Sequence, residues 1–116
     1  MFNVLSEYRS ADVLAEAMTA LRHALEKCPS ATEKIGAGQF VRIQLTRVTA
    51  PRLIPGSIGL REVIFGGSGT YKSNTLLGIC QAARRIVSCV LGGSTNVAAT
   101  RAVIVHAAQE SARNLR

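Results

Sequence analysis

The segment from Gln39 to Val48 alternates between apolar and polar side chains from Val41 to Thr46, and this pattern constrains the fold most strongly. Such alternation predicts a β-strand with one face toward the core and the other toward water. The apolar positions are Val41, Ile43 and Leu45, and the polar positions are Arg42, Gln44 and Thr46. A second strand is expected over about Leu60 to Phe65, so Arg42 and Arg61 are expected to share a sheet face.

Three segments carry apolar residues at helical spacing. They are Ser10 to Cys28, Leu76 to Val90, and a third helix that starts at Ser94 or Thr95 and runs to about Asn114. Ser10 is the expected N-cap of the first helix, and Pro29 ends it. Residues 30–38 carry loop signals, and Gly92-Gly93 is expected to stop the second helix.

These elements predict an α+β fold in one domain, residues 1–116. It has an N-terminal helix, a short antiparallel sheet and two C-terminal helices. Because two strands do not form a stable sheet unaided, a third strand is expected in Met1–Leu5 or Pro51–Gly59, or else a second copy completes the sheet. We favour completion of the sheet by dimerisation.

The net charge of +7 is unevenly distributed along the 116 residues. Up to residue 33 the two signs nearly balance, whereas from Lys34 to Arg101 the only acidic residue is Glu62. Such a basic stretch is most easily tolerated next to a polyanion. With 4% aromatic residues, little base stacking is expected, so nucleic acid, DNA or RNA, would be bound mainly through phosphates with weak sequence preference. The expected contacts are Arg42, Arg61, Lys72, Arg84, Arg85 and Arg101.

A glycine-rich segment follows the second strand. From Gly66 to Ser73 it resembles the P-loop of nucleoside-triphosphatases, in which G-x-x-x-x-G-K-[ST] follows a strand and opens a helix. Tyr71 stands at the position of the second glycine. The loop either connects strand to helix without binding a ligand or binds a phosphate without cleaving it. Gly92-Gly93-Ser94 also precedes a predicted helix, and if both helix N-termini lie on one side of the molecule they offer two clusters of donors to a phosphate backbone. The expected phosphate-loop residues are Gly67, Gly69, Lys72 and Ser73.

No constellation typical of catalysis is present, so the chain is not expected to be an enzyme. Beyond the loop the only carboxylate is Glu110, which leaves Mg²⁺-dependent phosphoryl transfer without its acidic ligand. His106 is expected to pack within a helix and His23 to face water. No metal or other cofactor is expected, because no His/Cys/Asp cluster has metal-ligand spacing.

The cysteine pattern and hydropathy suggest where the protein works. The three cysteines, Cys28, Cys80 and Cys89, are widely spaced and expected to be reduced, as in a cytoplasmic protein. No apolar run is long enough to span a membrane, and no signal peptide is visible. We therefore expect a cytoplasmic location, or the host cytoplasm or virion for a viral protein.

Three functions fit these observations. The first is a small basic homodimer or larger homo-oligomer that binds nucleic acid as an accessory, packaging or coat-like protein of a microbe or virus. The second is a nucleotide- or phosphate-binding module that uses the glycine loop without hydrolysis. The third is a purely structural protein that assembles with copies of itself.

Overall fold

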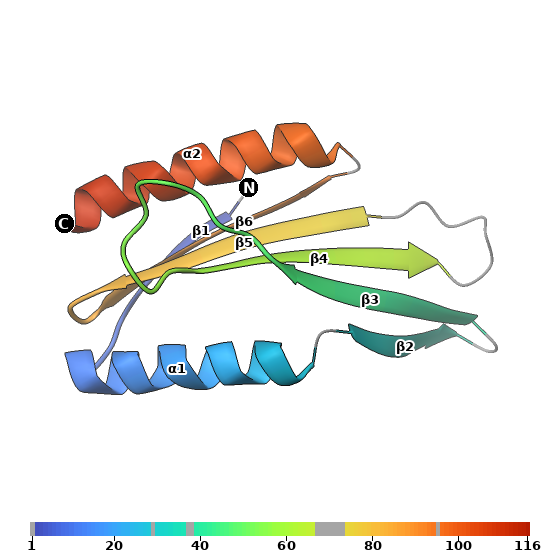
Figure 1. Ribbon diagram of the computed structural model, residues 1–116, viewed down its shortest axis with the longest axis horizontal. Coiled ribbons are helices and arrows are strands. Elements are labelled where there is room, and N and C mark those ends of the chain that lie inside the picture. Colours follow the sequence, from blue (N-terminus) through green and yellow to red (C-terminus); the bar gives the residue numbers. More distant parts are fainter. Residues whose placement is uncertain (1, 29, 37–38, 67–73, 95) are drawn as a thin grey trace.

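The computed structural model describes the backbone of residues 2–28, 30–36, 39–66, 74–94 and 96–116, and the side chains of residues 2–28, 44–62, 76–93, 96 and 98–116. Six strands and two helices make up these parts of the chain (Figure 1). The elements are β1 (Phe2–Glu7), α1 (Ala11–Lys27), β2 (Ser30–Gly36), β3 (Gln39–Arg47), β4 (Ile58–Gly66), β5 (Asn74–Ala83), β6 (Ile86–Ser94) and α2 (Val97–Leu115).

The strands form one antiparallel sheet in the order β1-β6-β5-β4-β3-β2. β1 and β2 are therefore the two edges, and β5 and β6 lie inside the sheet. The two helices lie on opposite faces of it (Figure 1). This arrangement follows from side-chain alternation, since successive residues of β5 face different helices.

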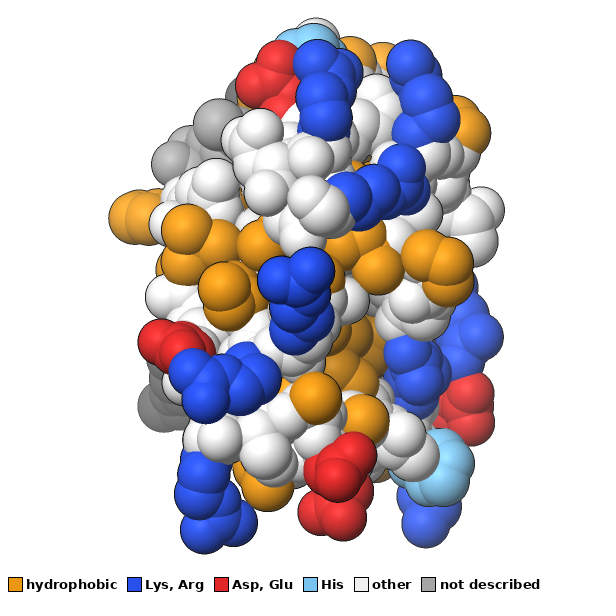
Figure 2. Space-filling model, turned by 90° about the vertical axis from the view of Figure 1, so that its left-hand side faces the viewer, with side chains coloured by type: hydrophobic (Ala, Val, Ile, Leu, Met, Phe, Trp, Pro, Cys, Tyr) orange, Lys and Arg blue, Asp and Glu red, His pale blue; other side chains and the backbone are white. Residues whose placement is uncertain are grey.

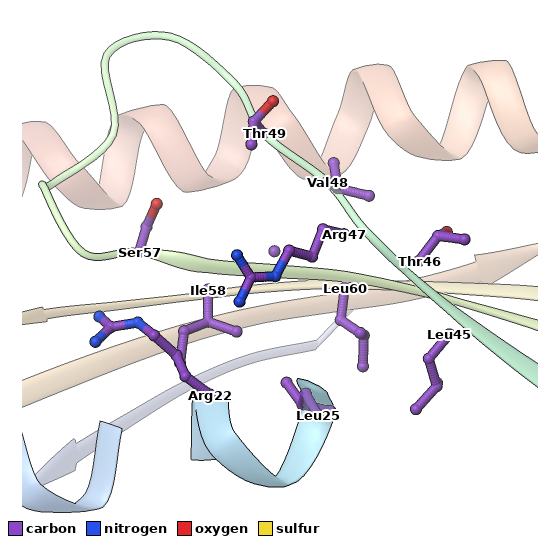
Figure 3. A pocket seen from close by; sticks show the side chains of 11 residues that line it. Arg22, Leu25, Leu45, Thr46, Arg47, Val48, Thr49, Ser57, Ile58 and Leu60 are labelled. Carbon is purple, nitrogen blue, oxygen red and sulfur yellow. The ribbon is translucent and has the colours of Figure 1, made fainter. Parts of the chain in front are cut away.

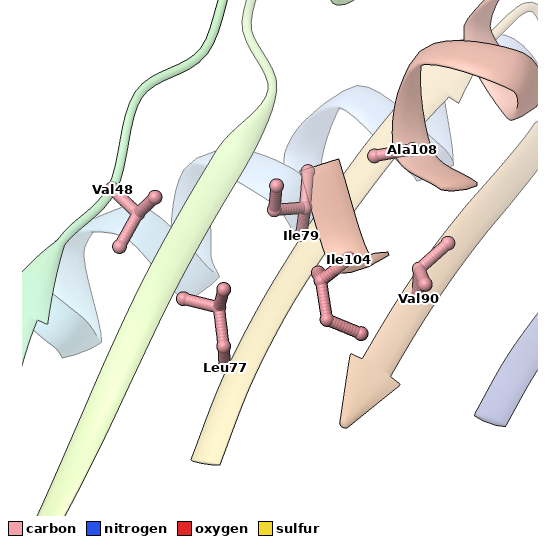
Figure 4. Close-up of a cluster of buried hydrophobic side chains, with 6 residues drawn as sticks. All are labelled: Val48, Leu77, Ile79, Val90, Ile104 and Ala108. Carbon is pink, nitrogen blue, oxygen red and sulfur yellow. The ribbon is translucent and has the colours of Figure 1, made fainter. Parts of the chain in front are cut away.

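The core beneath α2 is built from odd-numbered residues of β5 and their neighbours. Leu77 and Ile79 pack against Ile104 and Ala108 of α2, and all four are at most 3% exposed (Figure 4). Val48 and Val90 complete the cluster. Burying side chains of this size stabilises the fold by about 1.5–3 kcal/mol each.

A smaller core holds α1 against the other face. Leu14 and Met18 of α1 pack with Val87 of β6, with Cys80 and Cys89 at the margin of the cluster. The helix begins at the Ser10 cap, whose Oγ accepts a hydrogen bond from the Val13 N–H at 3.2 Å. The expected first helix and its N-cap are confirmed.

The connection between β3 and β4 is held against α2 by side-chain hydrogen bonds. Gln81, fully buried on β5, accepts from the Ile54 N–H at 3.0 Å and donates to the Ala108 carbonyl at 2.7 Å. Along α2, side chains donate to carbonyls of this connection: Arg101 to Thr49, Gln109 to Pro51 and Arg116 to Leu53. The segment thus forms a strap across one side of α2.

The predicted helix from Leu76 to Val90 is wrong, because these residues form the β5–β6 hairpin. A strand buried between two helical layers is apolar on both faces, so it lacks the polar–apolar alternation that marks an exposed strand. Chance 3–4 spacing of its apolar residues then mimics a helix. Gly92 and Gly93 lie within β6 rather than after a helix.

The α+β class is confirmed, but the element count differs from the prediction. One C-terminal helix is present, α2, capped by the Asn96 side chain, which accepts from the Ala99 N–H. The sheet has more strands than expected. Residues 2–7 form β1, in one of the two segments predicted to hold a third strand, and residues 30–36 form β2 instead of the predicted loop.

The prediction that all three cysteines are reduced is wrong for two of them. Cys80 and Cys89 are directly opposite in the β5–β6 register and form a disulfide, while Cys28 is free and exposed at the end of α1. The pairing was not predicted, because residues nine apart lie far from each other in a helix and come together only when the segment forms a hairpin.

Candidate functional site

The structure separates the cations that the sequence analysis grouped. Arg84 and Arg85 form the turn between β5 and β6, whereas Arg61 lies opposite Leu77 in the β4–β5 register. Arg84 is seven residues further along β5 than Leu77, which corresponds to about 23 Å at about 3.3 Å per residue. A single patch containing both arginines is therefore not formed by these strands.

Positions 42 and 61 lie on the same sheet face, as expected. Arg42 faces Phe65 and Thr46 faces Arg61 across β3 and β4, so both cationic positions fall on the α2 side of the sheet. Arg61 is half-buried, and its Nε is enclosed without a hydrogen-bond partner among the described residues. Such a group is a candidate for an ordered water or an anion.

The glycine segment cannot be placed in the same way. The phosphate-loop residues, Gly67, Gly69, Lys72 and Ser73, lie outside the described residues. The element that follows them is β5 and not the helix that the P-loop resemblance implies. The helix N-terminus that faces phosphate in such loops is therefore missing at residue 74.

Several other arginine side chains form hydrogen bonds or ion pairs within the chain. Arg47 forms an ion pair with Glu26 of α1, and Arg22 donates to the carbonyl of Gly56. Both line a pocket of about 120 Å³ between α1 and the β3–β4 strands (Figure 3). Arg101, exposed near the start of α2, donates to the Thr49 carbonyl at 3.2 Å.

The largest gathering of arginines lies at the end of the molecule that carries the β5–β6 turn. Arg9 adjoins Tyr8, whose N–H donates to the Arg85 carbonyl at 2.7 Å. α2 follows β6 and runs back along it, so its C-terminal residues reach the same end (Figure 1). We call this surface the arginine end, and its members are Arg9, Arg52, Arg84, Arg85, Arg113 and Arg116.

Figure 2 views this end of the molecule directly. Lys and Arg side chains extend over it from the side of α2 to the side of α1, with fewer Asp and Glu side chains among them. The connection that bears Arg52 reaches this end because Ile54 is bonded to Gln81, two residues before the end of β5. All six arginines of the arginine end are exposed.

Four members of the arginine end have no partner among the described residues. Arg85 pairs with Glu7, and Arg116 donates to the Leu53 carbonyl. The other four make no ion pair and no side-chain hydrogen bond in the described part of the chain. These four free arginines are Arg9, Arg52, Arg84 and Arg113.

Two of these free arginines hold an unfavourable backbone conformation. Arg52 has φ 61° and Arg84 has φ 56°, and they are the only non-glycine residues with positive φ in the described parts of the chain. The left-handed region costs a side-chain-bearing residue about 1–2 kcal/mol. Arg84 occupies the first position of a two-residue hairpin turn, where glycine is preferred when φ is positive.

Both histidines are exposed on helices. His23 faces water on α1 as predicted. His106 does not pack within the protein: its side chain is 72% exposed and its Nε2 lies 3.4 Å from Oε1 of Glu110.

In the described residues, no group of three or more His, Cys, Asp and Glu side chains is arranged to hold a metal ion, and neither helix combines the length and hydropathy needed to cross a membrane.

Comparisons of the chain with protein-family models, with curated proteins and with solved structures found no match. The class of protein is therefore described by its fold and candidate site alone. In the described residues these are an antiparallel six-stranded sheet between two helices and unpaired arginines at one end.

The sequence analysis identified two residues of the arginine end, Arg84 and Arg85, and missed the other four. Arg9, Arg52, Arg113 and Arg116 come from four separate positions in the chain and meet only through the sheet and the strap. Pro51 marks a loop in the sequence, whereas Ala83-Arg84-Arg85 contains no residue typical of turns. The convergence of these segments is a tertiary property.

Proposed function

We propose that the protein binds the phosphate backbone of nucleic acid, DNA or RNA, through the arginine end, as a small basic homo-oligomer with an accessory, packaging or coat-like role. The observation that carries this proposal is the pair of strained, exposed arginines without partners, Arg52 and Arg84. Strained backbone conformations of this kind cluster at functional sites.

Electrostatics supports the same proposal. A guanidinium presents a planar set of donors that matches phosphate oxygens and can bind them with two parallel hydrogen bonds. Four such groups without internal partners are available for counterion-releasing contacts with a polyanion. Arg42 and Arg61, on the α2 side of the sheet, remain proposed phosphate contacts. Lys72 lies outside the described residues and also remains a proposed contact.

The oligomeric part of the proposal is supported by the surface of one chain. Its accessible surface is 7587 Å² for 12.3 kDa, whereas a compact monomer of this mass exposes about 6,100 Å². The excess, about 1,500 Å², is larger than the area that each partner contributes to a standard protein–protein interface, about 800 Å². A purely self-assembling role is the alternative that this surplus favours.

Of the expected locations, we propose the virion rather than the cytoplasm. The Cys80–Cys89 disulfide supports this proposal, because disulfides persist on virions and are rare in the reducing cytosol.

The test compares two exposed arginines: Arg84, which is unpaired at the arginine end, and Arg101, which is bonded outside it. Arg84→Gln should weaken the binding of a short DNA duplex and of a short single-stranded RNA, by about tenfold for a lost charge-assisted contact of about 1.4 kcal/mol. Arg101→Gln is the matched control, because Arg101 is bonded to Thr49, and it should change affinity much less. Equal effects of the two variants would refute the role of the arginine end.

A further inference from the structure

We infer that the outer edge of β1 is the surface on which a second copy of this chain adds its own β1, antiparallel to the first. The inference rests on the oligomeric part of the proposed function and specifies its interface. It depends on the backbone orientation of β1, on its side chains and on its contrast with the other edge.

The hydrogen-bonding direction of each β1 residue follows from the register. Cys80 and Cys89 have a Cα–Cα distance of 4.1 Å, which marks a pair that exchanges no backbone hydrogen bonds. The N–H and C=O groups of Cys89 therefore point away from β5, toward its β1 partner Val4. The hydrogen bond from the Tyr8 N–H to the Arg85 carbonyl supports the same direction, because Tyr8 and Val4 are both even-numbered and so bond to the same side of β1.

Even-numbered residues of β1 consequently bond to β6, and odd-numbered residues present their backbone groups outward. Asn3, Leu5 and Glu7 thus offer three N–H and three C=O groups along an open edge, in the spacing that an added antiparallel strand requires. Among described residues, no backbone bond to this side of β1 is formed.

The side chains of β1 are unusually apolar for an exposed edge. All six residues are exposed, including Phe2 at 74%, Val4 at 48% and Leu5 at 66%. Ile86, opposite Glu7 on β6, adds another exposed apolar side chain beside the same edge. An apolar, unprotected edge of this kind is a template for pairing with another chain.

The opposite edge carries the protective features that β1 lacks. The β2 sequence Ser-Ala-Thr-Glu-Lys-Ile-Gly contains two charged residues, and its register with β3 shifts between Lys34 and Gly36. Charges and bulges are devices that prevent edge-to-edge association. β1 has a continuous register with β6 and one charge, Glu7.

A two-fold axis at Leu5 gives an acceptable set of cross-strand neighbours. Leu5 then faces Leu5 of the second copy, and Asn3 faces Glu7 of the second copy, so no like charges oppose each other. The same two-fold makes the contact self-complementary and closed, as in most homodimers. The surplus surface of one chain exceeds the share that one partner contributes to a standard dimer interface, about 800 Å².

The decisive variant is Leu5→Pro, measured by light scattering and sedimentation on protein freed of nucleic acid. Proline removes one outward N–H and no bond to β6, so the monomer should fold while the dimer dissociation constant rises at least tenfold. Val4→Pro is the contrast, because it removes an N–H that bonds to β6 and should destabilise the monomer. Wild type should have a mass of about 25 kDa, twice the 12.3 kDa of one chain.

Amide exchange provides a readout that needs no variant. In the wild-type dimer, the N–H groups of Asn3, Leu5 and Glu7 should exchange slowly at high protein concentration and quickly on dilution. Unchanged dimerisation of Leu5→Pro, or rapid exchange of these three amides in a dimer, would overturn the β1 inference alone. A monomeric wild type would overturn the oligomer proposal as well. The proposal that the arginine end binds nucleic acid is tested separately, by the affinity of each chain for nucleic acid.

Discussion

At the residue scale, Arg84 shows how function and stability oppose each other at one position. Replacing Arg84 by Gly should relieve a left-handed strain of about 1–2 kcal/mol, offset by about 0.7 kcal/mol of added freedom in the unfolded chain. We expect the free energy of unfolding to rise by about 0.5–1 kcal/mol while nucleic-acid affinity falls.

Chemical denaturation and binding measured on the same samples test this prediction. Arg84→Lys is the control, because it keeps both the charge and the strained backbone and should leave stability unchanged. Loss of stability in the Gly variant would show that the Arg84 side chain is structural.

Gly59 is a residue whose lack of a side chain is required by packing. A Cβ there would lie 2.1 Å from the Val48 carbonyl oxygen, a backbone atom that cannot move aside easily. Gly59→Ala should lower the free energy of unfolding by about 1–3 kcal/mol. Gly78→Ala is the control, because its Cβ would meet only the movable Cδ2 end of Leu91, and thermal unfolding should find it the less damaging change.

Gln81 couples three elements through one buried amide. Gln81→Leu keeps the volume but removes the acceptor for the Ile54 N–H and the donor to Ala108. We expect a loss of about 1–3 kcal/mol in the free energy of unfolding, the cost of leaving a buried polar group unpaired. An unchanged denaturation midpoint would mean that water replaces the amide and that the strap is not held by it.

At the scale of elements, the cysteine pairing is directly measurable. Thiol titration of the unfolded, unreduced protein should find one thiol per chain, that of Cys28, because Cys80 and Cys89 join β5 to β6. Reduction should lower the free energy of unfolding by about 2–3 kcal/mol, the loop entropy for a closed loop of roughly ten residues. Three thiols per chain would contradict the pairing.

The elements also show what a sequence can and cannot predict. α1 was predictable because it buries one side and displays helical periodicity, and β3 was predictable because its residues from Val41 to Thr46 alternate in polarity. β5 and β6 were not, because α1 and α2 cover both faces of them and remove the alternation. β2 lacked any apolar pattern, and only its pairing with β3 makes it a strand.

The arginine end was not predicted because the β5–β6 hairpin that brings its members together was not predicted. Arg84 and Arg85 were identified as cations but assigned to a helix, where they would have lined a polar stripe. Once Ala83 and Ile86 pair as neighbouring strands, the two arginines project at the tip of a hairpin, beside residues that are distant in sequence.

At the scale of the whole molecule, the charge is arranged by internal pairing as much as by position. Glu26 and Glu7 from the N-terminal quarter neutralise Arg47 and Arg85, so the sequence charge overstates the number of available cations. Exposed ion pairs of this kind contribute little stability. What remains unpaired at the arginine end determines how the molecule meets a polyanion.

The most direct test of the central claim is the salt dependence of nucleic-acid affinity. If Arg9, Arg52, Arg84 and Arg113 each contact a phosphate, together they should contribute about −3.6 to the slope of the logarithm of the association constant for duplex DNA against the logarithm of salt concentration, roughly a 150-fold loss between about 50 and about 200 mM. Changing all four to Gln should make the slope shallower by that amount. A variant that keeps the wild-type slope and affinity would contradict the account.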